Sequence, residues 1–211
     1  MISHALTIIM NELNKHLVDN YGSTDPQVRL GNLAEGFPSN SGSSNTEKDK
    51  LCISVVNIEE EKTLKNLPNH VNDNTTLKAT YENPPVYLNF LILLSATHSS
   101  YADALLVLSR AIRFFQSKKV FTQNDVDPTS ITKSVSPNQL DQLESFKLIM
   151  DLYSPTLEEI NHLWGTLGGK QYPFVVYRLR MLDLKFKAVQ SEGGLITEVL
   201  SNFSHKKTEV G

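Results

Sequence analysis

Cysteine is almost absent from this sequence, since Cys52 is the single one among 211 residues. One cysteine cannot form a disulfide within the chain, and such scarcity is typical of proteins from a reducing compartment. Cys52 stands in an apolar run, so we interpret it as a small core residue rather than as a reactive thiol. A chain of this length buries about 70% of its unfolded surface and needs no cross-link.

Long basic stretches are also missing, and with them the charge pattern of a nucleic-acid-binding protein. The formal net charge is −3 and the sequence pI is about 6.1. A nucleic-acid binder normally carries clustered lysines and arginines, so we expect no nucleic-acid partner. Residues 1–17 contain polar side chains throughout and no basic segment ahead of an apolar one, which disfavours a signal peptide. We therefore expect a cytoplasmic protein.

The strongest apolar run is too short to cross a membrane. It covers Val86–Ala96 and is interrupted by Asn89, whereas a transmembrane helix needs about 20 consecutive apolar residues. Pro84 and Pro85 favour extended geometry just before it, and its β-branched and aromatic residues favour a strand. Because the run is apolar on both faces, we predict a central strand that is covered on both sides, and no direct membrane insertion.

Catalytic and cofactor-binding motifs are missing too. The stretch GTLGGKQ at residues 165–171 is close to a phosphate-binding loop, but Trp164 stands where the first glycine is required and Gln171 where Ser or Thr is required. The stretch also closes a predicted helix instead of opening one, so we interpret it as a helix C-cap. No HExxH or GxSxG motif occurs. We therefore predict no enzyme activity and no cofactor.

A run of three acids, Glu59, Glu60 and Glu61, is a candidate cation site. Adjacent residues of a strand point to opposite faces, so the three carboxylates cannot all converge on one ion. We interpret them as the solvated end of a strand and predict no metal.

Apolar residues at helical spacing indicate three amphipathic helices. The first begins near residue 2 and should end near Gly22. The second should start after Ser99–Ser100, and the third after Ser154, with a proline at its first position and an end at Gly168–Gly169. The predicted inward face of the second helix consists of Tyr101, Ala104, Leu105, Leu108, Ile112 and Phe115.

Alternating or continuous apolar segments indicate the strands. They lie at 27–32, 51–58, 86–96, 146–152 and 175–187, with a shorter extended piece at 77–81. Residues 36–50 and 120–140 are polar, and we predict mobile loops there. The expected fold is α+β, with a mixed or mostly antiparallel sheet flanked by about three amphipathic helices. We place one domain at 1–188 and a C-terminal arm at 189–211.

The last predicted strand changes the phase of its alternation after Met181. A slip of one residue turns the apolar set to the other face. Either a β-bulge lies near Met181 and Leu182, with the later segment buried in its own domain, or the strand leaves the sheet to pack against a neighbouring subunit. The candidate interface residues on this strand are Leu182, Leu184, Phe186, Arg178 and Arg180.

Five stretches, taken together and in order, resemble a known family. They are VRLGN, ISVVNIEEEKTLKN, NPPVYLNFLILLSA, YADALLVLSRAIRFFQ and LWGTLGGKQYPFVVYRLRML, and they are spread over most of residues 1–187. The specificity comes from their combination, because none of them is a catalytic signature. The chain is similar to the tail cap, or tail terminator, proteins of phage-tail-like contractile injection systems, such as the antifeeding prophage and the Photorhabdus virulence cassettes.

The resemblance implies a structural protein with a phage tail terminator-like fold. It implies a hexameric ring on the distal end of the inner tube and contractile sheath, where the ring ends polymerisation and stabilises the particle. The expected partners are other copies of the chain and the sheath and inner-tube proteins of the same particle. Two further classes stay open: a cytosolic binding module or assembly chaperone for tail subunits, and an enzyme whose active site is assembled without a sequence motif.

Overall fold

The computed structural model forms two compact units. Its described residues are 1–22, 27–35, 49–64, 70–73, 78–81, 85–143, 145–184, 191–194 and 201. One unit contains residues 1–65 and 86–184, and the other contains 66–85 and 185–211. The boundary predicted after residue 188 lies outside the described residues, and so do residues 36–48 of the loop predicted at 36–50.

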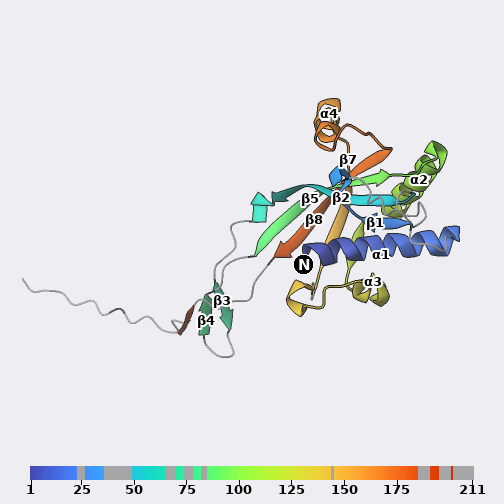
Figure 1. The fold of residues 1–211 in the computed structure, drawn as a ribbon. Coiled ribbons are helices and arrows are strands. Elements are labelled where there is room, and N and C mark those ends of the chain that lie inside the picture. The colour runs from blue at the N-terminus through green and yellow to red at the C-terminus, as the bar shows by residue number, and fades with distance from the viewer. Residues whose placement is uncertain are drawn as a thin grey trace, which may run out of the picture. The chain divides into compact units, whose positions relative to one another are not determined.

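A six-stranded sheet forms the centre of the larger unit (Figure 1). Every neighbouring pair in it is antiparallel, except the first, which is parallel. The prediction of a mixed, mostly antiparallel sheet is therefore confirmed. In spatial order, the strands are β1 (Val28–Leu30), β2 (Leu51–Glu60), β5 (Val86–Ala96), β8 (Phe174–Leu184), β7 (Lys147–Tyr153) and β6 (Val120–Thr122).

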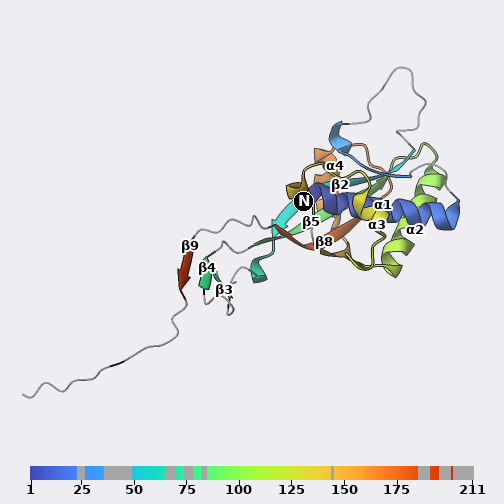
Figure 2. The same cartoon turned by 90° about the horizontal axis from the view of Figure 1, so that it is seen from below.

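Helices cover both faces of this sheet. The α-helices are α1 (Ile2–Tyr21), α2 (Tyr101–Ser117), α3 (Pro128–Thr132) and α4 (Leu157–Thr166), and the short 3-10 helices are η1 (Leu33–Glu35), η2 (Lys62–Leu64) and η3 (Gln139–Asp141). Helices α1 and α2 contribute to the main core on one face, and α4 packs on the other (Figures 1 and 2). The three long helices are the three amphipathic helices that the sequence predicts.

Strand β5 is buried on both faces, as its continuous apolar composition predicts. Phe90, Ile92 and Leu94 belong to the main core, and Leu93 packs with Trp164 of α4 on the opposite face. Each of these four strand residues is at most 1% exposed. Strand β5 lies between β2 and β8, away from the edges of a sheet that has a core cluster on each face, which explains this burial.

The ends of the first two long helices follow the predicted caps. Helix α1 ends at Gly22, whose φ of 66° is in the left-handed region that favours glycine, and its N–H donates to the Val18 carbonyl at 3.0 Å. Ser100 is the N-cap of α2, and its side chain accepts a hydrogen bond from the Asp103 N–H. Both ends are encoded within a few residues, which is why the sequence predicts them.

The buried face of α2 differs from the prediction. Tyr101 and Leu105 were assigned to that face, yet they are 69% and 45% exposed. Phe114 and Phe115 both enter the core, with ring centroids 5.0 Å apart. With both rings buried, the helix is rotated about its axis so that Tyr101 and Leu105 remain exposed. The buried residues of α2 are Ala104, Val107, Leu108, Ala111, Phe114 and Phe115.

The segment 120–140 was predicted as a long polar loop, but it contains β6, α3 and η3. Helix α3 starts with Asp127 as its N-cap and Pro128 at its first position, and the Asp127 side chain accepts a hydrogen bond from the Thr129 N–H at 2.8 Å. Elements of three to five residues are too short to show a hydrophobic period, so local capping is the one signal that could have revealed them.

Helix α4 starts two residues later than predicted. Thr156, and not Ser154, is the N-cap, because Thr156 and Glu159 form a reciprocal capping box. The predicted end is confirmed by Gly168 and Gly169, which have φ angles of 86° and 77°.

We expect Thr156→Ala to lower the free energy of unfolding by about 1 kcal/mol, since it removes the side-chain acceptor for an otherwise unpaired N–H. Ser154→Ala is the matched control, because Ser154 is exposed and two residues away, and it should change stability by less than about 0.5 kcal/mol. Urea denaturation of both variants measures the difference. Equal losses in both variants would contradict the assigned cap.

The smaller unit contains a three-stranded antiparallel sheet in the order β3 (His70–Asp73), β4 (Lys78–Tyr81) and β9 (Ser191–Gly194). The extended piece predicted at 77–81 corresponds to β4. Strand β3 lies in a stretch for which no strand is predicted, and β9 lies in the region predicted as an arm. Both are four residues long and depend on pairing with β4, a contact that sequence patterns do not reveal.

Candidate interaction surface

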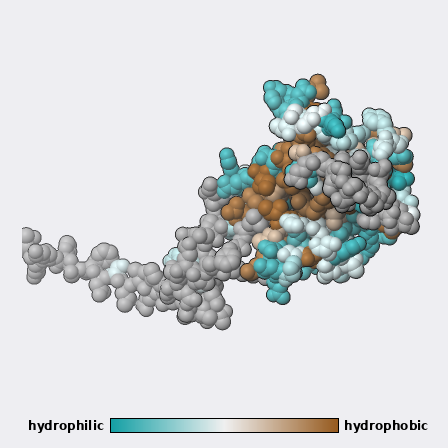
Figure 3. Space-filling view, in the orientation of Figure 1, coloured by the Kyte–Doolittle hydropathy of each residue, from teal (hydrophilic) through white to brown (hydrophobic). Residues whose placement is uncertain are grey.

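The end of the six-stranded sheet formed by the last part of β2 and the start of β5 exposes apolar side chains. In β2, residues 51–54 are buried and residues 55–60 are exposed. Val55, Val56, Ile58 and, on β5, Val86 are between 37% and 49% exposed. Hydrophobic residues gather on the sheet surface between α4 and α1 (Figure 3). Exposed β-branched residues grouped in this way are typical of a surface that contacts another chain.

Two irregularities in strand pairing occur near this end of the sheet. Between β2 and β5, Val55 pairs with Ile92 and Asn57 with Leu91, so Val56 is the extra residue of a bulge. Between β5 and β8, the pairs Phe90–Leu179 and Leu88–Leu182 leave two residues of β8 opposite a single residue of β5. Bulges increase the local twist and bend of a sheet.

The second bulge shows which of the two alternatives predicted for β8 is correct, a bulge within the sheet or a strand that leaves it. The strand stays in the sheet, with Leu182 paired to Leu88 and Leu184 paired to Val86. The change of phase in the sequence therefore coincides with a bulge at Arg180 and Met181, one residue before the predicted place. Whether Leu182 and Leu184 also contact a neighbouring subunit stays a prediction, and Phe186 lies outside the described residues.

Arg178 and Arg180, the two polar interface candidates, make their contacts with β7. The Arg178 guanidinium lies 5.1 Å from the centre of the Tyr153 ring, and Arg180 Nε lies 3.1 Å from Asp151 Oδ2. In the strand register, Asp151 is opposite Arg178. Both arginines therefore have partners within their own subunit, and the Arg180–Asp151 pair is nearly half exposed, so that its net energy is small.

Glu61 joins the end of β2 to β5. It accepts a hydrogen bond from the Thr63 side chain at 2.6 Å and another from Asn89 Nδ2 at 2.8 Å. These hydrogen bonds, first the one from Thr63, lower the pKa of Glu61 to about 2, with a smaller contribution from the positive charge of Arg180. Of the three adjacent acids, Glu59 and Glu60 are the last residues of the strand and Glu61 follows it, so the strand ends two residues later than the predicted 51–58.

We expect the Glu61 carboxyl to titrate near pH 2 and Thr63→Val to raise that midpoint, because the substitution removes the hydroxyl that donates to the carboxylate. A lowered pKa means that the contact stabilises the fold above pH 4.5, the ordinary value, and that this contribution is lost as the pH falls towards 2. Carboxyl-detected NMR titration measures both midpoints. An unchanged midpoint in Thr63→Val would contradict the assigned cause.

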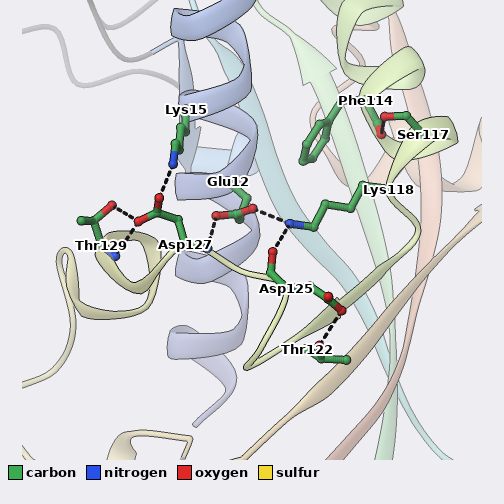
Figure 4. A network of polar contacts seen from close by, with 9 residues as sticks. All are labelled: Glu12, Lys15, Phe114, Ser117, Lys118, Thr122, Asp125, Asp127 and Thr129. Atoms are coloured by element: carbon green, nitrogen blue, oxygen red, sulfur yellow. Dashed lines mark hydrogen bonds and ion pairs between the residues drawn. The ribbon is translucent and has the colours of Figure 1, made fainter.

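A second polar cluster connects α1, the end of α2 and the start of α3 (Figure 4). Glu12 Oε2 lies 2.7 Å from Lys118 Nζ, and Glu12 Oε1 accepts a hydrogen bond from the Asp127 N–H at 3.1 Å. Lys118 also donates to the Asp125 carbonyl at 2.8 Å. The Glu12 side chain is 8% exposed, so these partners replace most of the water that would otherwise contact the carboxylate.

Asp127 is held by its neighbours in the same cluster (Figure 4). Lys15 donates to its carboxylate, and so do the side chain and N–H of Thr129. The hydrogen bond from Lys15, followed by those from Thr129, holds the pKa of Asp127 well below its usual range. The cluster therefore fixes α3 against α1, a long-range contact that the sequence did not indicate.

The strongly shifted acids do not have the properties of catalytic acids. Glu61 and Asp127 have lowered pKa values and stay ionised at neutral pH, whereas a general acid needs a raised pKa near the working pH. Among the described residues, no group of three or more His, Cys, Asp or Glu side chains is placed to hold a metal ion. None of the helices that the structure describes is long and apolar enough to cross a membrane.

The glycine-rich stretch before Lys170 is the end of a helix. The Gly169 N–H donates to the Trp164 carbonyl at 2.8 Å, which is the closing bond of a Schellman motif, and β8 follows after a short connection. A phosphate-binding loop instead presents the start of a helix to its ligand. The geometry matches the C-cap interpretation.

The fold resembles two solved structures from contractile injection systems. One is described as the PVC sheath/tube terminator in the extended state of an extracellular contractile injection system, with a TM-score of 0.63 and 13% identity over 100% of this chain and 65% of that one. The other is the anti-feeding prophage tube terminating cap, with a TM-score of 0.55 and 12% identity over 92% of this chain and 60% of that one. The chain thus spans less than two thirds of either relative.

Two comparisons of the sequence complement the structural ones. None of the curated proteins compared with the chain matches it. The sequence profile described as the Pvc16 N-terminal domain, in contrast, matches residues 4–198, far more than half of the chain. The chain therefore belongs to the Pvc16 N-terminal domain family.

Proposed function

We propose that this chain is a structural cap, or terminator, of a phage-tail-like contractile injection system. The observation that carries the proposal is the likeness of its fold, over the whole chain, to a sheath/tube terminator. The match to the Pvc16 N-terminal domain profile and the likeness to a tube terminating cap support it further. In this role the protein binds the distal end of the inner tube and sheath and ends their polymerisation, without catalysis.

The partners in this proposal are other copies of the chain, in a hexameric ring, and the sheath and inner-tube proteins. A cyclic ring joins two different surfaces of each subunit. The exposed apolar end of β2 and β5 is one candidate, and the segment of β8 with Leu182 and Leu184, continued by Phe186, is another. Assembly of the particle would take place in the cytoplasm of the producing cell.

Deletion of the gene tests the proposal. We expect tubes or sheaths of uncontrolled length, or unstable particles, because nothing would stop the addition of subunits. Electron microscopy of purified particles gives the length distribution, and re-expression of the intact chain should restore a narrow one. Uniform, contractile particles in the deletion strain would contradict the proposal. An assembly chaperone would be indicated if the chain were needed for assembly but absent from purified wild-type particles.

A further inference from the structure

Within the described residues, two strand edges have no neighbouring strand at the same end of the six-stranded sheet. Strand β1 pairs with β2 only as far as Ile53, and β7 pairs with β8 only as far as Arg180. Beyond these points, no strand within the described part of the chain pairs with the outer edge of β2 at residues 55–60 or of β8 at residues 181–184. Both segments still pair inward with β5.

The edge of β2 is suited to accept another strand. The Ile58 N–H donates to the side-chain oxygen of Asn57 at 2.9 Å, so it is not used in the ladder with β5. The Asn57 side chain thus supplies an acceptor for an N–H at the strand edge, and the carbonyl of an added strand could replace it. Val55, Val56 and Ile58 have high strand propensity and are exposed. An exposed apolar edge of this kind is a template for pairing with another chain.

The edge of β8 matches the edge of β2 in strand direction and in the charge of the residues at the strand ends. Both strands are antiparallel to β5, so they are parallel to each other. Rotation about an axis parallel to the strands would keep this direction from one copy to the next, so β8 of one copy can lie parallel to β2 of its neighbour. In the sequence, β2 ends in acidic residues, and Lys185 and Lys187 follow β8. In parallel pairing, the acidic end of β2 and the end of β8, which Lys185 follows in the sequence, point the same way.

We propose that the outer edge of β2, residues 55–60, pairs in parallel with the outer edge of β8, residues 181–184, of a second copy of this chain. The pairing joins the sheets of neighbouring subunits through a heterologous interface. This inference rests on the proposed function, because a ring of identical subunits supplies the second copy. The two surfaces that meet in the ring are then the edges of β2 and β8, and backbone hydrogen bonds join them.

Cysteine cross-linking in assembled particles tests the pairing. The native Cys52 is fully buried and gives little background. A chain that carries both Ile58→Cys and Leu184→Cys should give a ladder of covalent oligomers with a short bis-maleimide, because each subunit then reacts with two neighbours. Particles built from a mixture of the two single variants should give dimers and nothing larger, and each single variant alone should stay monomeric on a denaturing gel.

A second variant tests the hydrogen bonds of the edge. Ile58→Pro removes the outward N–H and leaves the ladder with β5 intact, whereas Ile58→Thr keeps both the donor and the branched side chain. We expect at least a tenfold loss of ring-bound protein in particles for Ile58→Pro and near wild-type amounts for Ile58→Thr. Circular dichroism of the purified chain checks that both variants are folded.

The outcomes separate this inference from the proposed function. Rings that cap particles normally but give no ladder would overturn the pairing and leave the cap function standing. A cross-link from residue 58 to a sheath or tube protein, with no cross-link between copies, would also overturn it, because the occupant would be a different chain. Normal particles in the deletion strain would remove the proposed function itself.

Discussion

Phe90→Ala is expected to lower the free energy of unfolding by about 3–5 kcal/mol, the usual cost of removing a buried phenylalanine. Phe90 is 1% exposed in the centre of β5, where the register places it between Ile58 of β2 and Leu179 of β8. Strand β5 is hydrogen-bonded to a neighbour on each side of Phe90, so the surrounding backbone cannot readily close over a cavity. Urea denaturation, followed by circular dichroism, measures the loss.

Val86→Ala is the matched control for Phe90→Ala. Val86 lies in the same strand but is 46% exposed, so its truncation should cost less than about 0.5 kcal/mol. The Tm of Phe90→Ala should fall by about 2–4 °C for each kcal/mol lost. A loss below about 1 kcal/mol in Phe90→Ala would show that β5 is not the rigid centre of the sheet.

Lys118→Met is expected to lower the free energy of unfolding by about 3 kcal/mol, because it leaves the buried carboxylate of Glu12 without its cation. Glu12 is 8% exposed and accepts hydrogen bonds from Lys118 and from the Asp127 N–H. Methionine keeps much of the volume and the apolar stem of the lysine, so loss of packing contributes little. Thermal and urea unfolding of the purified chain measure the change.

Substitution of the other partner, Glu12, should lower the free energy of unfolding by less. Glu12→Gln leaves Lys118 without its anion, but the lysine side chain is 27% exposed and water reaches its ammonium group. The double variant Glu12→Gln with Lys118→Met should be more stable than Lys118→Met alone, because no uncompensated charge is left in the core. Equal stability of Lys118→Met and the wild type would show that the pair does not hold α1, α2 and α3 together.

The elements predicted correctly are those whose signals lie within a few neighbouring residues. The continuous apolar run of β5, the glycine that ends α1 and the Ser100 cap of α2 each depend on local geometry. Backbone conformation at such places is set by side-chain size and by hydrogen bonds to the nearest N–H groups. The same signals explain the misplaced start of α4, where Ser154 and Thr156 are both acceptable caps and the capping box with Glu159 selects the second.

The sequence by itself determined the α+β class, the long strands and the three long helices, because hydrophobic period and capping act over a few residues. Only the tertiary structure decided how α2 turns towards the core, that β8 bulges instead of leaving the sheet, and that Arg180 pairs with Asp151. Each of these depends on residues far away in the chain, such as Tyr177 beside Phe115 or Leu88 opposite Leu182. Packing and register arise from contacts between distant segments, and a single sequence carries no direct record of them.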